Sequence, residues 1–353
     1  MNKLLGVGVQ NGASDIHFRP GDPPMYRVNG TLRGLKTEKL LPAHTRQIAL
    51  NLIREDAVKA QIDTLQEYDT SYGLDGVSRF RVNLYRQRGS LAAVLRIIPN
   101  DVPTIDGLGL PQVVKKLAAN ERGLVLVTGA TGSGKSTTLA AMVDHINRAD
   151  AVHIVTIEDP IEFVHRNQKA SISQREIGLD TSSYALALRA ALRQDPDVIL
   201  VGEMRDLETI DIALKAAETG HLVMSTVHTT DAVKTIGRLL SAFPAEEQTM
   251  VRHRLAENLV GVISQRLLPR IDNKGRVLAV EVMVQTKTVQ EYIVDSSRTG
   301  SLKDVIEKGR TTYGMQSFDQ HLSELYRTGQ VALDIAKAAA SNPADFERAL
   351  NFE

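Results

Sequence analysis

The sequence predicts an α/β protein of two domains, and three observations lead to this prediction. The chain has 353 residues, more than a single hydrophobic core usually supports. Between about residues 124 and 227, short apolar runs alternate with helical periodicity, which is typical of a mostly parallel buried sheet. Residues 99–111 are rich in proline, glycine and aspartate, a composition typical of a domain boundary. We therefore expect domains at residues 1–100 and 112–353, joined by a linker at 101–111.

The first domain is predicted to be a small α+β unit. Short apolar runs lie at residues 16–18 and 25–28, and the second run is followed by Asn29-Gly30, a pair typical of a β-hairpin turn. A helical stretch is expected from about residue 43 to residue 65. A further strand is expected at residues 91–98.

Residues 79–85 alternate strictly between polar and apolar side chains. This pattern places Phe80, Val82 and Leu84 on a core face and Arg79 and Arg81 on the opposite face. A solvated strand face accounts for both arginines and for Arg96 on the next predicted strand. The alternative is that one of them acts as a trans arginine finger, which offers its guanidinium to a nucleotide held by a neighbouring subunit. That hypothesis requires an oligomer.

The second domain is predicted to contain strands that alternate with helices. Four strands are expected at residues 124–127, 154–157, 198–201 and 222–227, and two helices at residues 135–147 and 184–192. A helical C-terminal region is expected at residues 246–267 and 319–326, where Met250, Leu255, Leu259, Ile263 and Leu267 are spaced for one packed face. Arg252 and Arg254 in that region are expected to face a neighbouring subunit.

Composition excludes several classes of function. Lys and Arg together number 42, as do Asp and Glu, and aromatic residues make up 4% of the chain. Binders of single-stranded nucleic acids usually combine a basic groove with stacking aromatic rings, so we expect no nucleic-acid partner. The absence of cysteine excludes disulfides and thiolate zinc sites. No apolar stretch is long enough for a membrane span or resembles a signal peptide, so we expect a cytoplasmic protein.

The segment from Gly129 to Ser136 matches the glycine-rich loop that cradles phosphates between a strand and a helix. Backbone N–H groups of such a loop, together with the positive end of the following helix, bind the phosphates of ATP. Lys135 is expected to reach the β- and γ-phosphates, and the Ser136 hydroxyl to ligate Mg²⁺. The expected nucleotide-binding residues are Gly129, Thr131, Gly132, Ser133, Gly134, Lys135, Ser136 and Thr137.

Acidic residues follow two of the predicted strands. Glu203 comes just after the strand at 198–201, and Gly202 occupies the position where an aspartate commonly ends such a strand. Metal contact is therefore expected through Ser136, water and Glu203. Residues 157–162 contain three carboxylates, and spacing alone leaves open which of them is the general base that orients the attacking water.

Two histidines, His221 and His228, flank the strand at 222–227 and should lie at its opposite ends. This separation argues against a shared metal ion. In the company of the other motifs, His228 is a candidate sensor of the γ-phosphate.

Taken together, these motifs resemble those of the type II and type IV secretion ATPases, and especially those of the retraction ATPases of type IV pili. The resemblance covers nearly the whole chain. It is carried by residues 129–136, Glu158-Asp159-Pro160-Ile161-Glu162, 193–197 leading into Gly202-Glu203-Met204-Arg205-Asp206, 219–221 and 227–229, and in the first domain by 13–17 and 78–81.

The resemblance implies a PAS-like first domain, a RecA-like second domain and a homo-hexameric ring that binds Mg²⁺ and ATP. It implies that Glu162 is the general base, that Glu203 is the Walker B acid and that His228 belongs to a histidine box. The ring would work peripherally at the inner membrane, beneath a membrane-embedded platform protein of the pilus, and would drive pilus retraction and twitching motility.

Two features bear on the role within that family. Relatives that assemble pili or secrete proteins usually carry a longer N-terminal extension and a tetracysteine zinc insertion, which this sequence lacks, so retraction is expected. However, residues 288–295 differ from the Ala-Ile-Arg-Asn-Leu-Ile-Arg-Glu motif typical of retraction ATPases, and residues 313–320 look more like accessory retraction ATPases. The alternatives are therefore the main retraction motor, an accessory paralogue that assists one, or a nucleotide-binding regulator of the pilus machine. A RecA-like nucleic-acid translocase is a further, less favoured alternative.

Overall fold

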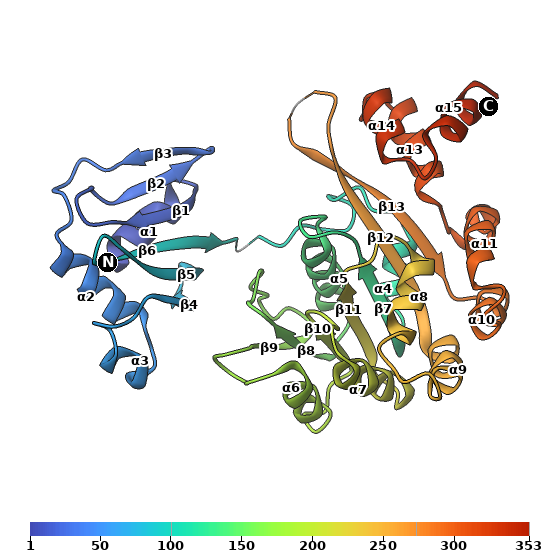
Figure 1. The fold of residues 1–353 in the computed structure, drawn as a ribbon, viewed down its shortest axis with the longest axis horizontal. Helices are drawn as coiled ribbons and strands as arrows, with labels where there is room; N and C mark the ends of the chain where they lie inside the picture. The colour runs from blue at the N-terminus through green and yellow to red at the C-terminus, as the bar shows by residue number, and fades with distance from the viewer. Residues whose placement is uncertain (100, 273, 353) are drawn as a thin grey trace. The chain divides into compact units, whose positions relative to one another are not determined.

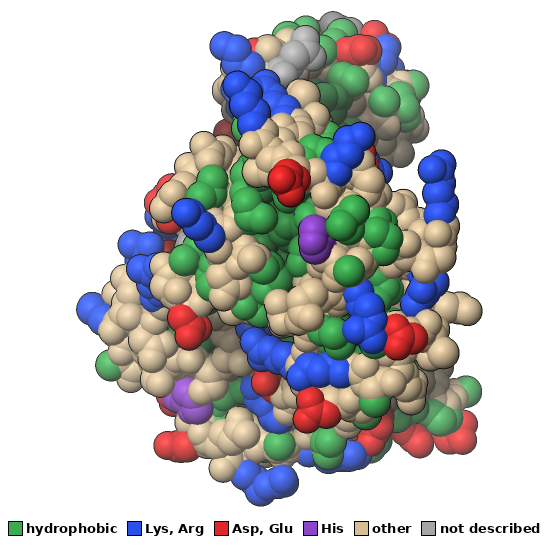
Figure 2. Space-filling view, turned by 90° about the vertical axis from the view of Figure 1, so that its left-hand side faces the viewer, with side chains coloured by type: hydrophobic (Ala, Val, Ile, Leu, Met, Phe, Trp, Pro, Cys, Tyr) green, Lys and Arg blue, Asp and Glu red, His purple; other side chains and the backbone are tan. Residues whose placement is uncertain are grey.

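The computed structural model describes residues 1–99, 101–272 and 274–352, and the chain forms two compact units (Figure 1). Unit 1 consists of Met1–Asp101 and Pro160–Val164. Unit 2 consists of Val102–Asp159 and His165–Glu353. Within the described residues, no helix is both long enough and apolar enough to cross a bilayer. Lys and Arg side chains are spread over the face drawn in Figure 2, with Asp and Glu side chains between them.

Unit 1 contains a six-stranded antiparallel sheet in the order β3-β2-β1-β6-β5-β4. Helix α1 packs on β1, and α2 packs on β6. The elements are α1 (Asn2–Gln10), β1 (Ala13–Phe18), β2 (Met25–Val28), β3 (Thr31–Gly34), α2 (Pro42–Leu52), α3 (Asp56–Ala60), β4 (Glu67–Leu74), β5 (Ser78–Gln87) and β6 (Ser90–Ile98).

Local patterns predicted this unit well, with one error. The side chains of Phe80, Val82 and Leu84 are fully buried, which confirms the alternation along β5. Asn29 and Gly30 both have positive φ, as a tight hairpin turn between β2 and β3 requires. The single helix expected at residues 43–65 is wrong, because α2 ends at Leu52 and Ile53 is extended and buried in the core.

Unit 2 contains a seven-stranded sheet in the order β13-β12-β7-β11-β10-β8-β9. All neighbouring strands run parallel except the pair β12 and β13, which confirms a mostly parallel α/β fold. The first elements are α4 (Val113–Ala118), β7 (Gly123–Thr128), α5 (Lys135–Ala149), β8 (His153–Glu158), β9 (Ser171–Glu176), α6 (Tyr184–Ala191), β10 (Val198–Val201), α7 (Leu207–Glu218), β11 (Leu222–Val227) and α8 (Ala232–Leu240).

Helices cover both faces of this sheet, because its parallel strands are apolar on both sides. Leu124 and Leu126 of β7 pack with apolar side chains of α6 to α9, whereas Val125 and Val127 pack with those of α4 and α5. Such two-sided burial explains why these strands have nearly continuous apolar sequences.

The remaining elements are α9 (Gln248–Asn258), β12 (Leu259–Pro269), β13 (Arg276–Val284), α10 (Lys287–Val294), a 3₁₀ turn (Thr299–Ser301), α11 (Leu302–Lys308), α12 (Arg310–Tyr313), α13 (Phe318–Arg327), α14 (Leu333–Ala339) and α15 (Pro343–Phe352). The helix expected at residues 246–267 is therefore wrong in its second half, which is strand β12. The helix expected at residues 319–326 is confirmed as α13.

The outer edge of β13 is covered by the C-terminal part of the chain. The backbone N–H of Val282 donates to Gln316 O at 2.9 Å, and Gln316 N–H donates back to Val282 O at 3.1 Å. The backbone N–H of Val280 donates to Nδ1 of His321 at 2.9 Å, and Val280 O accepts from Nε2 of Gln316 at 3.1 Å. His321 is buried, which lowers its pKa and favours the neutral ring that accepts this bond.

Candidate nucleotide-binding site

Four parallel strands of unit 2 end at the same edge of the sheet, and predicted site residues follow three of them. The glycine-rich loop follows β7, His228 follows the adjacent β11, and Glu203 follows β10, the next strand along. Strand β8 ends at Glu158. The carboxyl ends of parallel strands are where α/β proteins commonly bind ligands, so the topology brings these groups to one place.

The loop requires glycine at its first position. Gly129 has a φ of +146°, and a Cβ atom there would lie 2.5 Å from Ser133 Oγ and 2.6 Å from Gln265 O. Any side chain would therefore collide with both the loop itself and strand β12. This close packing holds the loop at the N-terminus of α5, a helix of 15 residues whose positive end suits phosphate.

Lys135 is buried at the base of the loop. Its Nζ donates to the carbonyl oxygens of Gly129 and Ala130, both at 3.0 Å. Nearby, Ser133 Oγ and Gln265 Oε1 are buried and make no hydrogen bond with another described residue. A buried ammonium group beside the unpartnered hydroxyl of Ser133, which can donate a hydrogen bond, fits a polyanionic ligand.

A cavity of about 320 Å³ opens beside the loop. Besides the loop residues 130–133, its lining includes Thr230, Gln265, Arg266, Leu267 and Arg276. Cζ of Arg266 lies 3.8 Å from the centroid of the Phe318 ring, so the guanidinium stacks over the ring. Burial lowers the pKa of Arg266. Sequence reasoning missed these residues, because they lie about a hundred residues or more from the loop and match no motif.

Glu203 lies at the centre of a charged group. Its Oε2 is 2.7 Å from Nε of Arg205 and 3.3 Å from Nε2 of His228. Glu203 and His228, each predicted separately as a site residue, are therefore in contact, and Arg205, which the sequence suggested only as part of a motif, is a third member of the group. His221 lies at the other end of β11, as predicted, where Nδ1 is 2.9 Å from Ala216 O.

Tyr184 explains why β10 is followed by Gly202 rather than by an aspartate. A Cβ atom on Gly202 would lie 2.9 Å from the Tyr184 hydroxyl and 3.2 Å from Ile157 O. Burial raises the pKa of Tyr184, and the charges of Glu203, Asp159 and Glu158 raise it further. A neutral phenol thus occupies the space that a strand-ending aspartate would need.

The carboxylates around residue 160 separate into two groups. Oε1 of Glu158 accepts from Thr156 Oγ1 at 2.7 Å and from Gln174 Nε2 at 3.1 Å, so this side chain is held within unit 2. Glu162 belongs to unit 1, together with Arg79 and Arg81. Within that unit Arg79 donates to Ser71 Oγ at 2.7 Å, and Arg81 is exposed.

The residues fit Mg²⁺ as an ion that accompanies a nucleotide. Ser136 and Glu203 offer oxygen ligands, and Mg²⁺ in nucleotide sites usually has one or two protein ligands besides phosphates and water. Among the residues that the structure describes, no three His, Asp or Glu side chains are grouped to hold a metal by themselves.

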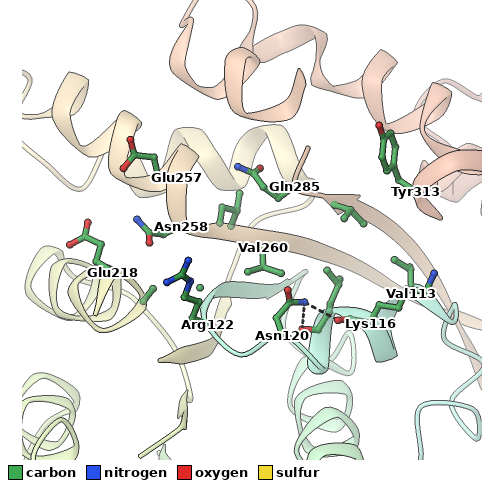
Figure 3. Close-up of a pocket in the computed structure, with 15 residues that line it drawn as sticks. Val113, Lys116, Asn120, Arg122, Glu218, Glu257, Asn258, Val260, Gln285 and Tyr313 are labelled. Atoms are coloured by element: carbon green, nitrogen blue, oxygen red, sulfur yellow. Dashed lines mark hydrogen bonds between the residues drawn. The ribbon is translucent and has the colours of Figure 1, made fainter. Parts of the chain in front are cut away.

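A second cavity, of about 510 Å³, lies at the opposite end of the sheet (Figure 3). Charged side chains of both signs line it, including Lys116, Arg122, Glu218 and Glu257. It surrounds Gly123, the first residue of β7, whereas the phosphate loop follows the last. The six residues of the strand separate the two by roughly 20 Å, so this cavity is not part of the nucleotide site.

Comparison with known proteins gives concordant results. The model of the family described as type II/IV secretion system protein matches residues 1–350. The chain is 46% identical to the type IV pilus retraction ATPase PilT of Pseudomonas aeruginosa over 98% of its own length and 99% of that protein. It is 40% identical to the type IV pilus ATPase PilU of the same organism, over 97% and 89% of the two chains. A crystal structure of the pilus retraction motor PilT with bound ADP superposes with a TM-score of 0.88 at 45% identity, covering 99% of both chains.

Proposed function

Because the chain belongs to the type II/IV secretion system protein family, whose matched pilus members are ATPases, we propose that it is a motor ATPase that couples ATP hydrolysis to retraction of type IV pili and so drives twitching motility. The observation that carries this proposal is the edge of the unit 2 sheet. There the phosphate loop, Glu203 and His228 follow neighbouring parallel strands.

The site residues at the carboxyl ends of these strands each have a role in the proposed reaction. The loop from Gly129 to Ser136, with Thr137, binds the phosphates of ATP through backbone N–H groups and the N-terminus of α5. Lys135 exchanges its two carbonyl partners for phosphate oxygens. Ser136 and Glu203 would hold Mg²⁺, which would neutralise phosphate charge when bound.

Water activation is assigned to Glu162, with His228 as the group that senses the γ-phosphate. Glu158 is a weaker candidate for the base, because Thr156 and Gln174 already hold its carboxylate. The assignment of Glu162 follows from the resemblance of residues 158–162 to the acidic motif of the secretion ATPases.

The architecture proposed for this function is a hexameric ring. We assign residues 1–100 to a PAS-like domain and 112–353 to a RecA-like domain with a helical C-terminal region. The segment 101–111, expected to be a linker, groups with unit 2 from Val102 on, and residues 160–164 group with unit 1. Arg79 or Arg81 would act in trans on the ATP of a neighbouring subunit. The proposed location is the cytoplasmic side of the inner membrane, reached through a pilus platform protein, with a paralogous retraction ATPase as a further partner.

A second candidate is an accessory retraction ATPase, since the chain is also 40% identical to PilU. The higher identity to PilT, 46%, favours the main motor. A nucleic-acid translocase is disfavoured by the equal numbers of basic and acidic residues.

The test is ATP turnover of the purified chain, measured together with its oligomer mass. Wild type should hydrolyse ATP as a hexamer. Lys135→Ala should lose nucleotide binding, whereas Glu203→Gln and Glu162→Gln should bind nucleotide and lose turnover. A hexamer that binds ATP without hydrolysing it would point instead to a regulator, and restored twitching in a strain that lacks its own retraction motor would establish the motor role.

A further inference from the structure

A row of three buried polar side chains crosses unit 2 beside the phosphate loop. Thr128, Ser264 and Glu281 lie opposite one another on the neighbouring strands β7, β12 and β13. Thr128 Oγ1 donates to Ser264 Oγ at 3.0 Å, and Ser264 Oγ donates to Glu281 Oε1 at 3.5 Å. Thr128 and Ser264 are fully buried, and Glu281 is 6% exposed. The row is therefore shielded from water along its whole length.

Both ends of the row reach the proposed nucleotide site. At one end, Thr128 directly precedes Gly129, the first residue of the phosphate loop. At the other end, Glu281 Oε1 accepts the backbone N–H of Ala232 at 2.9 Å, where α8 begins. Thr230, two residues before Ala232, lines the same cavity as loop residues 130–133. The row thus joins two walls of one cavity.

The segment from His228 to Asp231 is firmly attached to α8. Thr235 Oγ1 donates to Asp231 O at 2.7 Å and lies 2.7 Å from Thr229 Oγ1. Asp231 caps the helix by accepting the N–H of Lys234 at 2.8 Å. A displacement of the first turn of α8 would therefore be passed to His228, which contacts Glu203.

Glu281 is held in an environment that disfavours its charge. Burial is the main cause that raises the pKa of Glu281 to about 7, and the charge of Asp231 also raises it. The Ala232 N–H, the charge of Arg266 and the Ser264 hydroxyl act in the opposite direction. These are the groups that face it from α8 and β12, and β7 contributes the neutral hydroxyl of Thr128. The carboxyl group consequently changes charge near neutral pH, where an ionised oxygen accepts the Ala232 N–H more strongly than a neutral one.

We propose that Glu281 is a positioning residue for nucleotide turnover, which holds the phosphate loop and the His228 to Asp231 segment in a fixed relation through Ser264, Thr128 and Ala232. The inference rests on the proposed ATPase function. Glu281 touches no reacting atom in this role. Its loss should therefore impair turnover more than nucleotide binding, because the loop that binds phosphate keeps its own contacts.

The test compares Glu281→Ala and Glu281→Gln with wild type. A matched control is Gln316→Ala, which also removes a buried hydrogen bond to β13, that of Nε2 with Val280 O, on a residue outside the row. Glu281→Ala should lower kcat by about 10-fold or more and change the Kd for ADP by less than about threefold. Gln316→Ala should lower the melting temperature with little change in kcat.

The Gln variant isolates the charge, because it keeps an oxygen acceptor for Ala232 and does not titrate. The ratio of wild-type kcat to that of Glu281→Gln should rise between pH 6 and pH 8, because Glu281 becomes ionised in wild type over this range and the glutamine of the variant cannot. Titration of groups that both proteins share cancels in the ratio. A merely structural residue would not give this rise. Where Glu281→Ala fails to fold, Ser264→Ala breaks the row and leaves Ala232 its acceptor, and its kcat should also fall.

The outcomes separate this inference from the function on which it rests. If wild type is as inactive as Lys135→Ala, both proposals are overturned. If wild type is active and the folded Glu281 variant resembles Gln316→Ala, with reduced stability and unchanged kcat, the positioning role alone is wrong. A pH-independent ratio together with a fully active Ser264→Ala would lead to the same conclusion.

Discussion

Nε2 of His228 lies 3.3 Å from Oε2 of Glu203, although the two residues follow different strands and are 25 positions apart in the chain. The same oxygen pairs with Nε of Arg205 at 2.7 Å. Glu203 is mostly buried, whereas Arg205 and His228 are open to solvent. Two donors from different loops therefore orient one carboxylate at the centre of the proposed site.

Replacing His228 by alanine should lower kcat for ATP by about 10-fold or more, because Glu203 loses one of the donors that fix its orientation. His221→Ala is the matched control, since His221 lies at the other end of the same strand and bonds to Ala216 O. Steady-state turnover of both variants checks the prediction. Equal losses in the two would show that the effect comes from β11 as a whole.

Gly202→Ala should destabilise the protein by about 1–3 kcal/mol, because its Cβ would lie 2.9 Å from the Tyr184 hydroxyl. Tyr184→Phe removes that hydroxyl, so the double variant should recover about 1 kcal/mol in a double-mutant cycle. Urea denaturation of the four proteins measures the coupling. Strict additivity would mean that the clash with Ile157 O dominates.

His165 should make the protein sensitive to mild acid. Burial lowers its pKa to about 4, against a weaker opposing effect of Asp144. Because the folded state disfavours the proton, stability is full above the unfolded pKa of about 6.5 and is lost as pH falls towards 4. Between pH 7 and pH 5, wild type should lose about 2 kcal/mol more than His165→Gln in chemical denaturation. Parallel losses would show that other groups control acid unfolding.

Arg254 should contribute more to stability than an exposed arginine in a similar pair. Its side chain is 17% exposed and pairs with Glu218 at 2.5 Å and with Asp211 at 2.9 Å, linking α9 to α7. Arg254→Ala leaves two half-buried carboxylates without this partner and should cost about 2–3 kcal/mol. Arg189→Ala, which breaks an exposed pair with Glu208, should cost less than about 1 kcal/mol. Thermal or urea unfolding of both variants provides the comparison.

The contacts of Arg254, together with those of Arg252, correct the expected position of these two arginines. Arg252 and Arg254 were expected to face a neighbouring subunit, but both point into their own chain. Arg252 donates to Ile293 O at 2.7 Å and to Thr299 Oγ1 at 3.0 Å. Helical periodicity alone does not say which polar residues of a helix find intramolecular partners.

The sequence predicted those features best that depend only on residues close together in the chain. The turn at Asn29-Gly30, the alternation along β5 and the glycine-rich loop each depend on local geometry, and each is where it was expected. The error at β12 has a different cause. That strand is buried on both faces, so Leu259, Ile263 and Leu267 have no alternation to distinguish them from a helix face.

The contacts that organise the site could not be predicted, because they join residues far apart in the chain. Glu281 lies 49 positions from Ala232, and Ser264 lies 136 positions from Thr128. The distance between Glu203 and His228 depends on two parallel strands being adjacent in the sheet, which no local pattern specifies. Sequence motifs identified the site residues Glu203 and His228, whereas the order of strands in the sheet decides which site residues are in contact.

The covered edge of β13 limits how copies of this chain can associate. Val280 and Val282 have their outward N–H and C=O groups bonded to His321 and Gln316, so an added strand would find no free partners at these residues. Copies that associate through β13 would therefore have to use side-chain surfaces, which can slide and rotate, rather than a continuous backbone ladder, which cannot. By the same reasoning, truncation before Gln316 would leave the backbone N–H and C=O groups at the edge of β13 unpaired and would favour aggregation over ordered assembly.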